Sequence, residues 1–468
     1  MKSCVHNWKA ASWTLLFWCV LLGAQAQVAS LSPYSRFALG ELQSAGTTAQ
    51  RGFGGITAVD ASRFSVNGNN PASYSYLFRT AYNLDIRATR LSVDDGNEQV
   101  ALYGGTLNSA QFGFKRQGSK WGYGLGLRPY SSSGYEITIK EKLEDVGDVR
   151  YTYTGDGGFN QAHAGVSRAF GIKGKSGLLE STAEGDTLAP MHTLSFGVNL
   201  DYIFGQLATT RRVLYTEPGY YDTRIQNKTN MQTLSATAGV LALFQLKSAN
   251  KALGAHTDLL VGATYSLERD AAATYSVLNE SIFSTGGSEL VTDTAAYQPN
   301  IAGTMTMPAR FTAGLALVHQ DSKERTWTLA ADIKMQDWTA FSTDFDLLSE
   351  VTELQQYHEL SFGISVNPAL LSENTGALQR GTYRLGFRTA DSYISVRDNP
   401  ISEWALTGGF TLPISKSNST SMFHFGIEFG SRGTTANNLV QEHFLHTFAG
   451  FSFSPVRSNQ WFVERKYD

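Results

Sequence analysis

The sequence predicts an all-β protein, a transmembrane antiparallel β-barrel of about 14 strands with an N-terminal plug segment. Three observations support this fold class. The chain has 45 Gly, 21 Tyr, 27 Phe and 8 Trp but only 11 Pro. Its apolar runs after residue 26 are short, and its mean hydropathy is −0.20. Apolar and polar residues instead alternate along many segments, which is typical of membrane strands and not of membrane helices.

Residues 1–26 have the features of a secretory signal peptide. Lys2 and Lys9 give a charged start, residues 13–22 are apolar, and an Ala-Gln-Ala sequence ends at Ala26. This order predicts export and cleavage after Ala26. An uncleaved anchor is the weaker alternative, because the apolar run is shorter than the roughly 20 residues of a spanning helix. An exported barrel belongs in the cell outer membrane, in contact with its lipid.

Four segments show the alternation most clearly: 121–128, 327–336, 383–388 and 423–430. In each, one face is apolar and the other is small or charged, as expected where one face meets lipid and the other a lumen. The predicted barrel covers residues 78–453. A secreted β-propeller or β-helix would also alternate, but the sequence shows no repeat of fixed period.

The inward faces of these strands carry charged and polar side chains, which we predict to face the lumen: Asp332, Lys334, Arg384, Arg388, His424 and Glu428. Two interpretations are open. They are paired residues that hold the barrel and the plug together, since a polar interior is usual in such barrels. Alternatively, some of them steer a ligand that carries a carboxylate.

Residues 27–77 lack the strand alternation and are predicted to form the plug, with a periplasmic extension as the alternative. Glycine and asparagine in this segment provide tight turns. The residues of the predicted plug motif are Gly52, Gly54, Gly55, Asn70, Pro71 and Ala72. At the other end, residues 454–468 are predicted to be a charged periplasmic tail or a partner contact.

Catalytic and metal chemistry find little support in the sequence. Cys4 and Cys19 both lie inside the predicted signal peptide, so the mature chain has no thiolate chemistry. His443 and His446 are three residues apart, which places them on opposite faces of a regular strand. We therefore expect no enzyme activity, no cofactor and no metal. The formal net charge of −3 also predicts no nucleic-acid partner.

Two stretches resemble the FadL-type family of outer-membrane transporters for long-chain fatty acids and other hydrophobic compounds. The first is the Gly-rich stretch 52–58 followed by Asn-Pro-Ala at 70–72, just before the first predicted strand. The second is 307–317, followed by the Trp-x-Leu-x-x-Asp pattern at 327–332 and Asp-Trp at 337–338. The likeness covers the N-terminal segment and the middle of the barrel. The tail 454–468 departs from it, because members of that family commonly end at the last strand.

The resemblance implies a barrel of fourteen strands, an N-terminal hatch, and a ligand that leaves sideways through a gap in the wall. It favours a porin-like function, the passive uptake of hydrophobic small molecules such as fatty acids. The alternative is a FadL-like barrel that serves as a structural subunit of an outer-membrane secretion or barrel-assembly complex, with protein partners in the outer membrane or periplasm, because a shared fold does not settle function.

Overall fold

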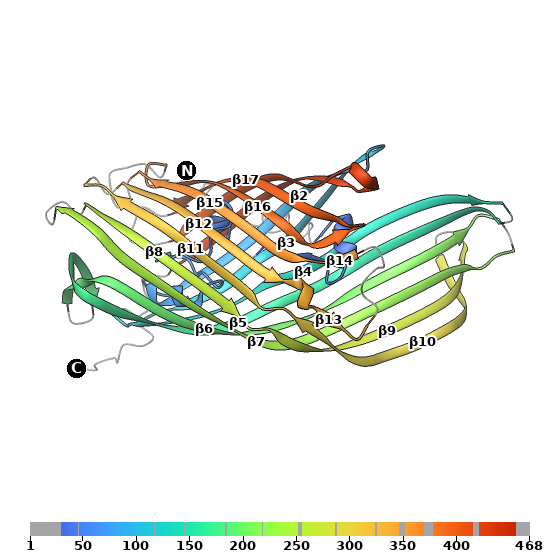
Figure 1. The fold of residues 1–468 in the computed structure, drawn as a ribbon, viewed down its shortest axis with the longest axis horizontal. Helices are drawn as coiled ribbons and strands as arrows, with labels where there is room; N and C mark the ends of the chain where they lie inside the picture. Colours follow the sequence, from blue (N-terminus) through green and yellow to red (C-terminus); the bar gives the residue numbers. More distant parts are fainter. Residues whose placement is uncertain are drawn as a thin grey trace, which may run out of the picture.

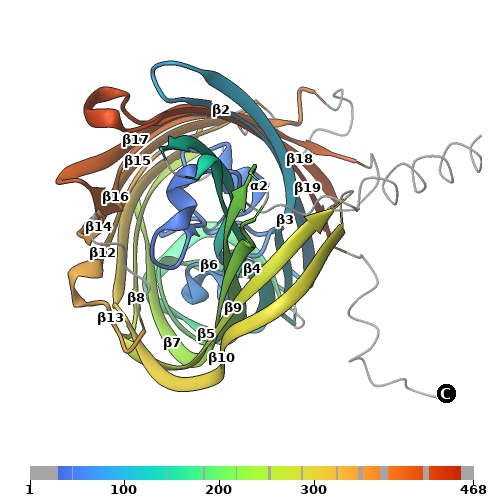
Figure 2. The ribbon, with the colours of Figure 1, turned by 90° about the vertical axis from the view of Figure 1, so that its right-hand side faces the viewer.

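The computed structural model describes residues 30–454, apart from positions 45, 117, 145, 183–184, 218, 251–254, 286–287, 323–324, 346–351, 369–377 and 415–420. These residues form an elongated barrel of antiparallel strands around an irregular N-terminal segment (Figures 1 and 2). The predicted signal peptide, and the predicted tail beyond Ser454, lie outside the described residues. In the described part of the chain, no helix has the length and apolar character needed to cross a membrane.

A closed ring of 14 strands forms the wall, which confirms the predicted fold class. Each strand pairs antiparallel with the next, and the last pairs with the first over Tyr82↔Phe453 to Asp94↔Gln441. This last pairing closes the ring, as lipid requires, although β3 and β4 are joined over only Ala110↔Leu127 to Phe114↔Tyr123. In ring order the strands are β2 (Ala81–Asp94), β3 (Gln99–Phe114), β4 (Trp121–Leu143), β5 (Gly147–Thr182), β6 (Gly185–Tyr215), β7 (Asp222–Asn250), β8 (Ala255–Ser266), β11 (Arg310–Gln320), β12 (Thr326–Asp337), β15 (Gln356–Asn367), β16 (Thr382–Val396), β17 (Asn399–Pro413), β18 (Met422–Gly433) and β19 (Gln441–Phe453).

The alternation read from the sequence separates the two faces of this wall. Leu125, Leu315 and Phe362 point outward, and each is at least half exposed. Arg128 and His424, on the opposite face, are buried in the lumen. An apolar exterior around a polar interior is the arrangement expected of a barrel in lipid.

Two further strands lengthen the wall on one side. β9 (Arg269–Thr285) continues the line of β8 along β7, and β10 (Ser288–Met307) continues into β11. The sequence predicts one strand over 255–279 and another over 304–319; the structure interrupts the first after Ser266 and begins the second at Ser288. Residues 289–302 of β10 are exposed on both faces. They escaped prediction because a strand with no buried face needs no alternation.

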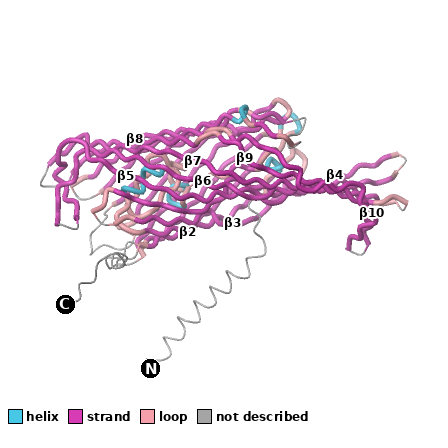
Figure 3. The backbone as a smooth tube through the Cα atoms, turned by 90° about the horizontal axis from the view of Figure 1, so that it is seen from below, coloured by secondary structure: helices cyan, strands magenta, loops and turns pink. Residues whose placement is uncertain are grey.

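Six strands project past the rest of the barrel at the end opposite Ala81 and Phe453, as Figures 1 and 3 show. We call this region the extension. It comprises residues 134–143 of β4, 147–156 of β5, 206–215 of β6, 222–232 of β7, 274–285 of β9 and 288–303 of β10.

The N-terminal segment, residues 30–77, lies inside the ring (Figure 2). Its regular elements are short: η1 (Pro33–Arg36), β1 (Glu41–Leu42), α2 (Thr48–Arg51) and η2 (Pro71–Tyr76). A capping box starts α2, because Thr47 accepts a hydrogen bond from the Gln50 amide while the Gln50 side chain binds the Thr47 amide. The remaining short elements border the ring at η3 (Trp338–Ala340), β13 (Ser342–Thr343), β14 (Thr352–Leu354) and η4 (Ala436–Asn438).

One part of the ring depends on this segment for its pairing. β3 and β4 pair only from Ala110↔Leu127 to Phe114↔Tyr123. Beyond that point β1 pairs with β4 instead, at Glu41↔Ser132 and Leu42↔Ser131. The segment therefore supplies hydrogen bonds to the edge of β4 where β3 separates from it.

An apolar core fills the lumen between the segment and the wall, toward the extension. Phe37 and Leu39 of the segment pack in one cluster with wall residues that include Phe159, Ile203 and Trp338. A lumen filled by close-packed side chains at this level is a hydrophobic core and not an open channel.

We predict that Phe159→Ala destabilises the folded barrel by about 3–5 kcal/mol, because this side chain is fully buried in the core. The measurement is the unfolding midpoint in denaturant, followed by heat-modifiable migration on a gel. Phe196→Ala is the control, since Phe196 is 50% exposed on the outer face. Equal losses from the two variants would contradict a core at Phe159.

Candidate functional site

The contact between the N-terminal segment and the inner wall is the candidate functional site. Wall side chains accept hydrogen bonds from backbone amides of the segment. The pairs are Thr48 N–Asp85 Oδ1 at 2.8 Å, Gly54 N–Thr407 Oγ1 at 2.9 Å, Thr57 N–Asp332 Oδ2 at 2.6 Å, Ala58 N–Asp332 Oδ2 at 2.8 Å, Val66 N–Asn83 Oδ1 at 2.9 Å and Gly68 N–Gln111 Oε1 at 2.9 Å. An irregular segment cannot satisfy its own buried amides, so the wall does so.

A buried charge cluster joins the segment to β16 and β18. The Glu428 carboxylate forms two ion pairs. Arg51 Nη2, which belongs to the segment, lies 2.6 Å from one oxygen, and Arg388 Nη2, which belongs to the wall, lies 2.6 Å from the other. The Glu428 and Arg51 side chains are only 0% and 3% exposed. Arg388 also pairs with Glu403. Removing one partner from such a cluster leaves a buried charge uncompensated, which costs several kcal/mol.

The cluster continues along β12 and β15. Lys334 Nζ lies 2.6 Å from Glu359 Oε1 and donates to the Gly55 carbonyl at 3.0 Å. The Tyr357 hydroxyl donates to Glu359 at 2.6 Å. The ammonium group of Lys334 therefore connects the wall directly to the backbone of the predicted plug motif.

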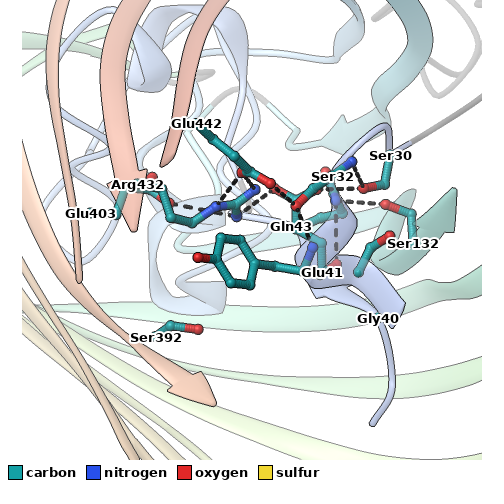
Figure 4. A network of polar contacts seen from close by, with 12 residues as sticks. Ser30, Ser32, Gly40, Glu41, Gln43, Ser132, Ser392, Glu403, Arg432 and Glu442 are labelled. Atoms are coloured by element: carbon teal, nitrogen blue, oxygen red, sulfur yellow. Dashed lines mark hydrogen bonds and ion pairs between the residues drawn. The ribbon is translucent and has the colours of Figure 1, made fainter. Parts of the chain in front are cut away.

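A second cluster, centred on Arg432, is shown in Figure 4. Arg432 binds Glu442 at 2.6 Å and Glu41 at 3.0 Å. Ser32 Oγ donates to Glu442 at 2.6 Å, and Ser30 Oγ donates to Glu41 at 2.7 Å. Burial alone would raise the pKa of Glu41, but Arg432 and Ser30 outweigh it and lower that pKa to about 2. Glu41 is therefore ionised at any physiological pH.

The glycines of the predicted motif allow the segment to touch the wall. Gly54 has φ +76°, and a Cβ atom there would lie 2.4 Å from the Phe362 carbonyl oxygen. A Cβ atom on Gly52 would lie 3.0 Å from Gly409 Cα. Gly55, with φ +81°, completes the turn whose carbonyl binds Lys334. These glycines are thus needed for backbone conformation and close approach.

Asn70, Pro71 and Ala72 start η2 and contact the opposite wall. The Asn70 side chain accepts from the Ala72 amide at 3.1 Å and donates to the Val240 carbonyl at 3.2 Å. Pro71 occupies the first turn, where no amide donor is needed. The Ala72 carbonyl accepts from Ser195 Oγ at 2.7 Å.

The structure places all six predicted lumen residues on the inner face and separates them into two groups. Asp332, Lys334, Arg388 and Glu428 bind the segment directly or through one another, as described above. Arg384 and His424 instead converge on Thr411 of β17, at 2.6 and 2.8 Å, and His424 also contacts Ser452 at 2.6 Å. The second group ties neighbouring wall strands together.

Sequence reasoning missed several members of these clusters: Glu41, Arg51, Glu359, Glu403, Arg432 and Glu442. For the wall residues a signal existed, because Glu359 and Glu442 stand at inward positions of alternating strands, as Glu428 does. Arg51 and Glu41 lie in elements of only four and two residues, α2 and β1, which are too short for periodicity to indicate which way a side chain points.

The lumen also contains two small polar cavities. One of about 90 Å³ is lined by residues that include Arg51, Arg388 and Arg432, and one of about 70 Å³ by residues that include Lys334 and Glu359. Ligand sites for small molecules usually have roughly 300–1,000 Å³. Among the described residues, no group of three or more His, Cys, Asp or Glu could hold a metal ion.

A barrel of this kind, with a segment bound in its lumen, has the fold of outer-membrane channels. The deltaS2S3 mutant of the monoaromatic hydrocarbon channel TodX matches with a TM-score of 0.51 and 16% identity, over 87% of this chain and 99% of that one. The Pseudomonas putida toluene transporter TodX matches with a TM-score of 0.50 and 16% identity, over 88% and 99%. A Pseudomonas aeruginosa FadL homologue matches at 0.45 and 10%, over 88% and 98%.

The chain belongs to the BamG family, whose model matches residues 9–468. No curated protein matches it. The resemblance to FadL-type transporters therefore holds for the fold, which is consistent with an outer-membrane location, while the family is BamG.

We predict that Glu428→Gln lowers the free energy of unfolding by about 3–5 kcal/mol, because it leaves Arg51 and Arg388 without their shared carboxylate. The measurement is the unfolding midpoint in urea. Glu136→Gln, at an exposed position of β4, serves as the control. A midpoint unchanged from the wild type would show that the cluster does not hold the segment.

We also predict that Gly54→Val releases the segment from the wall, because the side chain would collide with the Phe362 carbonyl and strain a positive φ. Limited trypsin digestion of the folded barrel should then cut after Arg51 or Arg63. Gly408→Ala is the matched control, since the nearest atom to its new Cβ would be 3.6 Å away. Protection of both sites in Gly54→Val would contradict the close contact.

Proposed function

We propose that this protein is a structural subunit of an outer-membrane barrel-assembly complex, a role suggested by the name of its family. The observation that carries the proposal is the anchoring of the N-terminal segment. Charged and backbone hydrogen bonds attach it to the wall from Ser32 to Gly68. A barrel whose lumen is filled in this way is suited to act as a rigid membrane body that presents surfaces to partners.

The anchoring argues against passive uptake as the main role. Release of the segment would break the Arg51–Glu428 pair and the Lys334–Gly55 bond, both inside the barrel. Buried charge-assisted bonds of this kind are costly to break. A hydrophobic solute would also have to displace the apolar core around Phe159 and Trp338.

Uptake of hydrophobic compounds such as fatty acids remains the second candidate, favoured by the fold shared with the TodX channels. The two candidate functions assign different roles to the charged side chains in the lumen. In the subunit proposal they hold the segment; in the uptake candidate they would have to re-pair during every transport cycle. The predicted periplasmic tail, 454–468, belongs to the subunit proposal as a partner contact.

We expect the full-length protein, tagged and extracted from its own outer membrane in mild detergent, to co-purify with barrel-assembly proteins in a fixed stoichiometry. Depletion of the protein should then lower the amount of other outer-membrane barrels that reach the heat-modifiable state. Growth on fatty acids should be unaffected. Recovery of a lone barrel with bound fatty acid, together with normal assembly of other barrels after depletion, would exclude the subunit role.

A further inference from the structure

The extension has two faces of different chemistry. Strand alternation continues from the lumen core, in which Phe159 and Leu207 point inward. The inner face therefore carries Ile137, Ile139, Tyr151, Tyr153, Val213 and Ile225, which are paired across neighbouring strands. The outer face carries Thr138, Lys140, Arg150, Arg212, Arg224 and Gln226. The extension is thus an amphipathic sheet.

The described chain covers its apolar inner face only in part, because five of these six side chains are half-buried while Ile139 is exposed. Figure 3 shows the region around β4 and β10 standing clear of the barrel body. Ile139 is 50% exposed. An antiparallel sheet normally buries its apolar face, so a separate molecule has to supply the cover.

The edges of the extension do not favour the addition of another strand. β10 has register shifts at Val291/Asp293, Thr294/Ala296 and Gln298/Ile301. It also contains Pro299, which cannot donate a ladder hydrogen bond. Lys140 and Lys142 lie on the free edge of β4. Bulges, proline and lysine are the devices that protect an edge from pairing, so contact is expected through the inner face.

The charges distinguish the two faces further. On the outer face, Arg212 pairs with Glu289 at 3.4 Å, and Arg224 pairs with Glu280 at 2.5 Å. On the inner face, Arg211 stacks over the rings of Tyr151 and Tyr153, at 6.0 and 5.6 Å from their centroids. Arg211 is exposed, and within the described residues no carboxylate forms an ion pair with it. The inner face therefore offers a guanidinium group that the protein itself does not neutralise.

We infer that the inner face of the extension is a docking site for a second protein, one that places carboxylate side chains among apolar ones over Arg211 and its two tyrosines. Tyrosine and arginine are the residues enriched where protein interfaces bind most strongly. Long connections of outer-membrane barrels lie outside the cell, so the partner acts on the extracellular side. The inference rests on this face alone and does not require the proposed function.

The test uses the full-length protein in its native outer membrane, with a photo-crosslinking amino acid at position 137 on the inner face or at 138 on the outer face. We expect position 137 to form an adduct with one protein species and position 138 to form none. Arg211→Glu should reduce that adduct at least tenfold. Arg150→Glu, on the outer face of the adjacent strand, should leave it unchanged, and Arg211→Lys should retain most of it.

A replacement of one partner carboxylate by arginine should restore the adduct with Arg211→Glu. Heat-modifiable migration of each variant checks that the barrel is folded, which exposed positions such as 211 should permit. The inference is overturned by an adduct with lipopolysaccharide or with a second copy of this chain. It is equally overturned by adducts of similar yield from both faces, or by none from position 137 in a folded barrel.

Discussion

The carboxylate of Glu428, held between Arg51 and Arg388, is the contact on which the interior depends. It is fully buried, so loss of Arg51 or Arg388 would leave its charge without a compensating partner, at a cost of several kcal/mol. Backbone amides of the segment, from Thr48 to Gly68, also donate hydrogen bonds to wall side chains, so the segment is attached to the wall along this part of the lumen. Gly52 and Gly54 make this attachment sterically possible, because without side chains they allow the segment to come into van der Waals contact with the strands. The wall and the segment therefore behave as one folded unit.

The wall could be predicted from the sequence to a large extent, and the interior only in part. Alternation identified inward residues such as Asp332 and Glu428 because a wall strand must separate lipid from lumen. It did not identify residues of the segment such as Arg51 and Glu41, since these lie in a single helical turn and a two-residue strand, which are too short to show a periodicity. Residues 289–302 of β10 were missed for another reason. They are exposed on both faces, so they carry no pattern that a sequence argument can use.

The stretches that resemble FadL-type transporters have structural roles in this chain. Gly52 and Gly54 allow close approach to the wall, and Asn70 closes a helical turn against β7. The likeness thus indicates how the N-terminal segment is seated in the barrel, which a transporter and an assembly subunit can share. A difference in function is better sought in the extension, where the strands project beyond a simple barrel.

The span of the contacts in sequence has a consequence for how the chain folds. Arg51 is separated from Glu428 by 377 residues, and Ser32 from Glu442 by 410. The N-terminal segment can therefore form these contacts only after the last strands have formed, and until then its charged side chains are solvated. Because it must finally lie within the ring, the seam between β2 and β19 has to close around it. Folding is thus dominated by very long loops, which makes it slow and exposes intermediates to aggregation. A protein of this design would itself be a demanding client of the cellular machinery that inserts barrels.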